Sequence, residues 1–193
     1  MKHSLHTVLT LLFVCASAWG ENVPWQNPQI NEINREPAHA HFIPYTNEAN
    51  ALKQQALPAA QRFAVNPATE RRISLDGTWK FLFSKNNEEC PTDFYKMGYN
   101  TKRWKDIQVP GSWELQGFDS PIYTDVAYPF PANPPHVPND YNPVGAYVRE
   151  FTVPAHWKGM DIFLDFEGVE SAFYCWVNGE LAGYSCLLYT SDA

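Results

Sequence analysis

Residues 173–184 have the sequence FYCWVNGELAGY, which contains the strongest turn signal in this chain of 193 residues. Asn178-Gly179 separates two runs of apolar and aromatic side chains. An Asn-Gly pair readily takes positive φ at both central positions of a tight turn. We therefore predict an antiparallel hairpin with strands over 173–177 and 180–184.

Further strands are predicted on the amino-terminal side of this hairpin. Runs that alternate between apolar and polar side chains, or that are rich in β-branched and aromatic residues, cover 78–83, 107–109, 147–153 and 160–166. In the last run, Ile162, Leu164 and Phe166 would share one face of the strand. Short strands without intervening helices predict an antiparallel β-sandwich.

The composition excludes several classes of protein. The net charge is −7 and no basic run is present, which argues against a nucleic-acid partner because phosphate contacts need clustered Lys and Arg. Hydrophobic residues make up 45% and charged residues 18%, so the chain is not wholly disordered. Sixteen prolines exclude a helical bundle. The chain is also too short for a complete (β/α)₈ barrel, which needs roughly 200 residues or more.

The first 20 residues have the features of a signal peptide. A charged start at Met1-Lys2-His3 precedes an apolar run over 4–18. Ala16-Ser17-Ala18 then provides a small-x-small cleavage site, with Ala18-Trp19-Gly20 as a second frame. The run is too short to span a bilayer comfortably. We expect a secreted or periplasmic protein without membrane attachment after cleavage; a buried amino-terminal helix is the alternative.

The segment that follows, 21–70, is expected to form an extended amino-terminal arm, because six prolines interrupt it. A weak helix is predicted over 50–61, interrupted at Pro58.

No metal site is predicted from the cysteines or from their spacing. Beyond the leader the chain has Cys90, Cys175 and Cys186, without a CxxC pair, and this spacing matches no zinc site. Isolated thiols are expected. Motifs for serine hydrolases, nucleotide binding and zinc proteases are also absent from the sequence.

Residues 106–148 differ most from the rest of the chain. They contain five acids, seven aromatics and eight of the sixteen prolines, and neither Lys nor Arg. Acceptor oxygens and aromatic faces without cations suit a neutral polyol, whose hydroxyls need acceptors and whose C–H face needs an apolar surface. The competing interpretation is a proline-stiffened loop that packs its aromatics onto its own sandwich. Both interpretations remain open at this point.

Motifs spread along the chain resemble those of glycoside hydrolase family 2 β-galactosidases. They are WQNP (25–28), NREP (34–37), FIPY (42–45), LDGTWKF (75–81), VPGSWELQG (109–117), PIYT (121–124), YPF (128–130), YNPVG (141–145), FEGV (166–169), SAF (171–173), WVNG (176–179) and GYS (183–185). The resemblance implies an all-β, jelly-roll sugar-binding domain over 71–185, incomplete at its carboxyl end. In the family an immunoglobulin-like domain and a catalytic barrel follow it.

The resemblance also implies the activity of the whole enzyme, which would be a secreted β-galactosidase that hydrolyses β-galactosides with retention. The two catalytic glutamates of the family lie in the barrel, so we expect no catalytic residue in these 193 residues and no activity from them alone. Full-length members suggest Mg²⁺ and Na⁺ as cofactors, whereas none is expected in this part. The expected partners are a β-galactoside, the carboxyl-terminal domains and further copies in a homo-oligomer.

Two positions depart from the family pattern. Asp125 stands where the familiar form has an Asn that contacts galactose, and the resemblance places Asp125 and Val126 beside that sugar. Residues 186–193 match nothing in the family and are interpreted as a foreign tail. Two other functions remain possible, a free-standing carbohydrate-binding module without catalysis and a sandwich used only for subunit contact.

Overall fold

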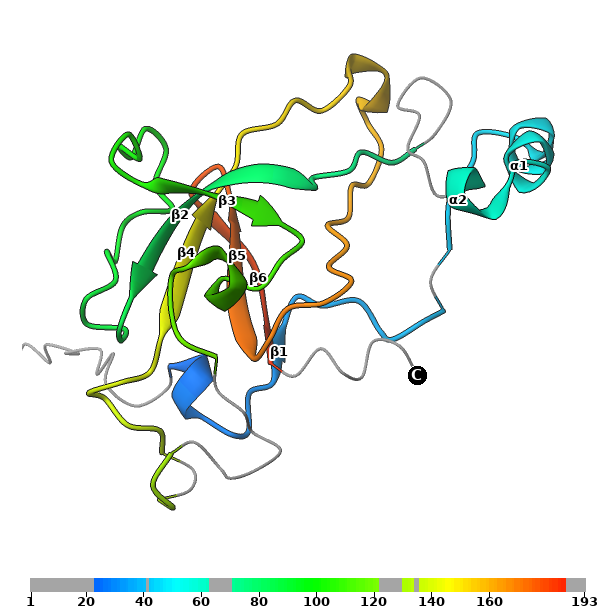
Figure 1. The fold of residues 1–193 in the computed structure, drawn as a ribbon. Coiled ribbons are helices and arrows are strands. Elements are labelled where there is room, and N and C mark those ends of the chain that lie inside the picture. Colours follow the sequence, from blue (N-terminus) through cyan, green and yellow to red (C-terminus); the bar gives the residue numbers. More distant parts are fainter. Residues whose placement is uncertain (1–22, 41, 63–70, 122–129, 134–135, 187–193) are drawn as a thin grey trace, which may run out of the picture.

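The computed structural model describes residues 23–40, 42–62, 71–121, 130–133 and 136–186. Within them, six strands form two antiparallel three-stranded sheets, in the orders β1-β6-β5 and β3-β2-β4 (Figure 1). The strands are β1 (Glu32–Ile33), β2 (Gly77–Ser84), β3 (Lys105–Val109), β4 (Val144–Val148), β5 (Ala172–Val177) and β6 (Glu180–Cys186). The helices are α1 (Glu48–Gln55) and α2 (Ala59–Arg62), with 3₁₀ turns η1 (Pro24–Gln26), η2 (Glu114–Gln116) and η3 (Ala155–Trp157). The prediction of an all-β sandwich is confirmed.

The hairpin β5–β6 forms as its turn sequence predicts. Val177 pairs with Glu180, and the two turn residues between them have φ values of +52° at Asn178 and +93° at Gly179. Strand β1 then extends this sheet by pairing Ile33 with Tyr184. The segment expected to be only an extended arm therefore supplies an edge strand, which two residues are too short to reveal as a periodic pattern.

Strand β2 is the centre of the second sheet. It pairs with β3 on one side and with β4 on the other. The aromatic run over 78–83 predicts the strand but not its central place in the sheet. Phe94, from the connection between β2 and β3, lies 6.0 Å from Trp104 and 5.6 Å from Trp176, measured between ring centroids. Because Trp104 precedes β3 and Trp176 belongs to β5, this ring joins the cores of the two sheets.

Two strand predictions are wrong in whole or in part. The strand expected over 147–153 begins earlier, at Val144, and ends at Val148. The segment 160–166 forms no strand, and Ile162 and Phe163 are 50% and 67% exposed. Alternation gives a segment one apolar face, but a strand also needs a hydrogen-bonding neighbour, and no described strand pairs with this segment.

The helix prediction is confirmed, including its interruption. Helix α1 begins after Asn47, whose side chain accepts a hydrogen bond of 3.0 Å from the Asn50 backbone N–H, and α2 begins directly after Pro58. Both helices lie to one side of the two sheets (Figure 1). No helix among the described residues is both long and apolar enough to cross a membrane. The three described cysteines are free thiols, as expected.

Gly145 on β4 allows two aromatic rings to pack directly against the backbone of this strand. A Cβ atom at this position would lie 2.6 Å from the Trp113 ring and 2.7 Å from the Phe81 ring. Phe81 itself is 1% exposed, so its ring cannot move away without opening the core. The missing side chain at Gly145 is therefore what lets Trp113 pack onto the sheet beside Phe81.

We predict that Gly145→Ala lowers the free energy of unfolding by about 1–3 kcal/mol, the usual cost of overpacking a core. Urea denaturation measures the change. Gly168→Ala is the matched control, because no heavy atom lies within 4 Å of a Cβ built there, and it should change stability by less than about 0.5 kcal/mol. Equal effects of the two substitutions would contradict the close packing at Gly145.

Candidate functional site

The loop that follows β3 is anchored to β2 by aromatic rings. The Phe81 ring centroid lies 6.0 Å from that of Trp113 and 4.6 Å from that of Phe118. Tyr147 on β4 lies 4.7 Å from the same ring. For these three aromatics of the 106–148 segment, the interpretation that they pack onto their own sandwich is confirmed.

Gln116 holds the same loop to the edge of β3. Its side-chain Oε1 accepts a 2.8 Å hydrogen bond from the Gln108 backbone N–H, and its Nε2 donates one of 3.0 Å to the Gln108 carbonyl. The amide thus imitates the pairing of a neighbouring strand. Gly117, with φ of +83°, then turns the chain towards Phe118. These contacts fix where the segment leaves the sheet.

A hydrogen bond between Asp119 and Tyr141 holds together the two ends of residues 119–141. The Tyr141 hydroxyl donates a 2.6 Å hydrogen bond to the Asp119 carboxylate, across 22 positions of sequence. This hydrogen bond, with smaller contributions from burial and from the charges of Asp119 and Glu114, raises the pKa of Tyr141 to about 12. The part of the chain between Asp119 and Tyr141 therefore begins and ends at neighbouring points.

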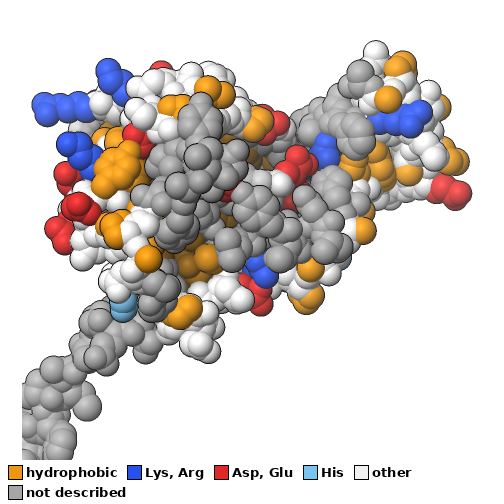
Figure 2. Space-filling model, turned by 60° about the horizontal axis from the view of Figure 1, so that its bottom comes forward, with side chains coloured by type: hydrophobic (Ala, Val, Ile, Leu, Met, Phe, Trp, Pro, Cys, Tyr) orange, Lys and Arg blue, Asp and Glu red, His pale blue; other side chains and the backbone are white. Residues whose placement is uncertain are grey.

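The surroundings of this loop base are acidic. The Ser112 hydroxyl donates a hydrogen bond to the Glu114 carboxylate. Burial, and secondly the charge of Glu114, raise the pKa of Tyr147 to about 12. On the face shown in Figure 2, acidic, basic and hydrophobic side chains all occur, and several basic ones gather at the left edge. At the loop base itself, the carboxylates of Glu114 and Asp119 lie near Tyr141, which suits a neutral ligand better than an anion.

The sequence-predicted site residues Asp125 and Val126 lie outside the described residues. The structure places the two ends of their segment at Asp119 and Tyr141. Sequence reasoning missed this pair, and it also missed Gln116. Neither interaction follows a local period, because one spans 22 positions and the other 8.

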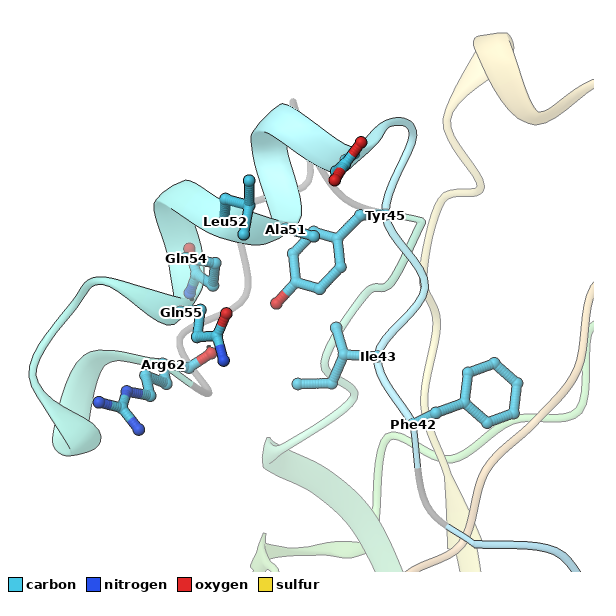
Figure 3. Close-up of a pocket in the computed structure, with 9 residues that line it drawn as sticks. Phe42, Ile43, Tyr45, Ala51, Leu52, Gln54, Gln55 and Arg62 are labelled. Carbon is cyan, nitrogen blue, oxygen red and sulfur yellow. Dashed lines mark hydrogen bonds between the residues drawn. The ribbon is translucent and has the colours of Figure 1, made fainter.

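Two of the hollows on the surface of the described residues are of interest. The larger, about 420 Å³, is a mostly apolar groove between α1 and the segment before it, and Figure 3 shows Tyr45 and Ile43 directed towards α1. The smaller, about 140 Å³, is lined by Trp25, Gln26, Asn86, Asn87, Glu88, Pro138, Asn139 and Asn142. The first offers hydrophobic contact, whereas the second offers one aromatic ring and many amides.

The described residues do not fit a metal site of protein side chains. No group of three or more His, Cys, Asp or Glu side chains converges within them, whereas Mg²⁺ and similar hard cations need several oxygen ligands.

Comparison with known proteins identifies a family and several relatives. Residues 73–191 match the family described as glycosyl hydrolases family 2, sugar binding domain. The chain is 41% identical over 163 residues to a β-galactosidase of Priestia megaterium, covering 82% of this chain and 15% of that protein. It is 38% identical to the β-galactosidases of Halalkalibacterium halodurans and Psychromonas ingrahamii, covering 85% and 83% of this chain and 16% and 14% of theirs. The chain thus spans about one seventh of the length of these relatives.

We predict that Asp119→Asn lowers the pKa of Tyr141 from about 12 towards the ordinary value for tyrosine, because the amide is neutral. The hydrogen bond stabilises the fold below the ordinary tyrosine pKa and is lost as the pH rises through about 12. NMR titration with ¹³C-labelled tyrosine rings measures the change.

Asp140→Asn is the matched control for this titration. The Asp140 carboxylate accepts a hydrogen bond from the Tyr141 backbone N–H, so its substitution should leave the high pKa of the phenol in place. A Tyr141 pKa that is the same in Asp119→Asn as in the parent would show that the two side chains do not pair in solution.

Proposed function

Because the chain belongs to glycosyl hydrolase family 2, we propose that it is the sugar-binding, amino-terminal part of a secreted β-galactosidase. The observation that carries this proposal is the 37–41% identity to β-galactosidases over more than four fifths of the chain. The whole enzyme would hydrolyse terminal β-D-galactosyl residues with retention, as part of carbohydrate metabolism.

In this proposal the chain binds and orients the sugar, and other domains supply the chemistry. Retaining hydrolysis needs one carboxylic acid as general acid and base and one carboxylate as nucleophile, about 5–5.5 Å apart. The family resemblance places both outside these 193 residues. We therefore expect the chain alone to bind sugar without cleaving it, because orientation without the two carboxyl groups does not break the bond.

Asp125 is proposed as an acceptor for a galactose hydroxyl, with Val126 lining the same subsite. A carboxylate accepts hydrogen bonds but cannot donate as an amide does, so Asp125 would favour a sugar hydroxyl that acts as donor. The geometry around the segment supports this role, because the Phe81 cluster and the Asp119–Tyr141 hydrogen bond hold both of its ends.

We predict that Asp125→Ala in the complete enzyme lowers kcat/KM by the equivalent of about 1–3 kcal/mol, the cost of an unpaired buried hydroxyl. Steady-state kinetics on a chromogenic β-galactoside measure it. Asp161→Ala removes an exposed carboxylate from another part of the chain and serves as control. Unchanged kcat/KM together with a loss of stability would instead assign Asp125 to capping its own loop.

Export is proposed from the amino-terminal sequence, which lies outside the described residues. The charged start, the apolar run and the small residues at Ala16 and Ala18 predict cleavage after Ala18 or Gly20. Mass spectrometry of the protein recovered outside the cytoplasm should show one of these two amino termini. A recovered protein that still begins with Met1-Lys2 would contradict the proposal.

A further inference from the structure

The 140 Å³ crevice beside Trp25 has the lining of a small carbohydrate site. Three segments far apart in sequence form it, namely η1, the turn after β2 over 86–88, and the approach to β4 over 138–142. In Figure 1 the blue coil of η1 lies beside the yellow-green segment that leads into β4. A sugar bound there would contact all three segments at once.

Backbone hydrogen bonds hold the walls of this crevice in place. The Asn142 backbone N–H donates a 2.8 Å hydrogen bond to the Lys85 carbonyl, which joins the second and third segments. The Trp25 backbone N–H donates one of 3.4 Å to the Tyr174 hydroxyl on β5, which ties η1 to the other sheet. Because backbone atoms make these bonds, the lining side chains remain available to a ligand.

Most polar side chains of the crevice are unused. Among the described residues, no hydrogen bond or ion pair engages the side chains of Gln26, Asn87, Glu88, Asn139 or Asn142. Each side-chain amide has an NH₂ group that donates and a carbonyl oxygen that accepts. A sugar hydroxyl also donates and accepts, so it can pair with either group. Glu88 is the one charged residue that lines the crevice. The lining therefore offers no Lys or Arg to bind a phosphate or a carboxylate.

Trp25 completes this chemistry with an apolar surface. Its side chain is half-buried and lines the crevice, and an indole ring offers a large rigid surface to the C–H face of a sugar. The volume is that of about one pyranose ring, too small for a folded peptide or a nucleotide. The larger groove in Figure 3 differs, because its lining is mostly apolar and nothing in the structure shows what covers it.

We propose that the crevice formed by Trp25, Asn87, Asn139 and Asn142 is a binding site for one neutral hexose ring, separate from the subsite assigned to Asp125. It shares residues 138–142 with the returning end of the 106–148 segment, next to Tyr141. A sugar in the crevice would therefore contact residues 138–142 and stabilise the carboxyl-terminal end of the segment that contains Asp125.

Ligand titration of the whole chain tests this site, with methyl β-D-galactoside and methyl β-D-glucoside as probes. We expect the indole N–H resonance of Trp25 to shift with a dissociation constant of about 1 mM, because a small open crevice immobilises the sugar with few contacts. The double variant Asn139→Ala/Asn142→Ala should weaken binding at least tenfold. The side chains of Asn139 and Asn142 make no hydrogen bond or ion pair within the described residues, so we expect the double variant to fold, and it remains a test if Trp25→Ala proves unstable.

Two controls separate this site from the proposed galactose subsite. Gln29→Ala removes an exposed amide outside the crevice and should leave binding unchanged, whereas Asp125→Ala reports on the proposed galactose subsite. No shift of the Trp25 resonance at about 100 mM of either sugar, a hundredfold above the expected constant, would overturn the inference. Binding that survives the double variant but is lost in Asp125→Ala would also overturn it, while supporting the proposed function.

Discussion

The packing of Phe81 against Trp113 over the bare backbone of Gly145 is the constraint on which the site depends. Phe81 is 1% exposed and contacts rings from the loop after β3 and from β4. Because Gly145 has no side chain, the Trp113 ring can pack directly on the sheet. Phe118, from the same loop, packs against Phe81 as well. The loop after β3 is thereby part of the core. Its packing also fixes the position of Asp119, where the next part of the chain begins.

From this base the chain builds a surface suited to uncharged, hydroxyl-rich ligands. The 106–148 segment contains no Lys or Arg, and Glu114 and Asp119 lie at its anchored end, where they raise the pKa of Tyr141. The returning end contributes Asn139 and Asn142 to the crevice at Trp25. Both ends thus present oxygen and amide groups, which match the needs of a sugar better than those of a phosphate.

The parts of the fold that follow local rules could be predicted from the sequence. Asn178-Gly179 specified the hairpin, and the alternating aromatic run over 78–83 predicted the strand β2. The parts set by distant partners could not be predicted in this way. Strand β1 is two residues long and exists because β6 offers an edge, whereas 160–166 alternates correctly but lacks a neighbour. The Asp119–Tyr141 hydrogen bond spans 22 positions, and Asp125 was indicated by family resemblance alone.

Native-state hydrogen exchange tests most directly whether the loop and the sheet form one cooperative unit. The backbone N–H groups of Gln116, Gly117 and Phe118 donate hydrogen bonds within the loop that Trp113 anchors. If the Phe81 cluster joins the loop to the core, these amides open only with β2 and exchange with the same free energy as the β2 amides. Rapid exchange of the three loop amides while β2 stays protected would contradict the account.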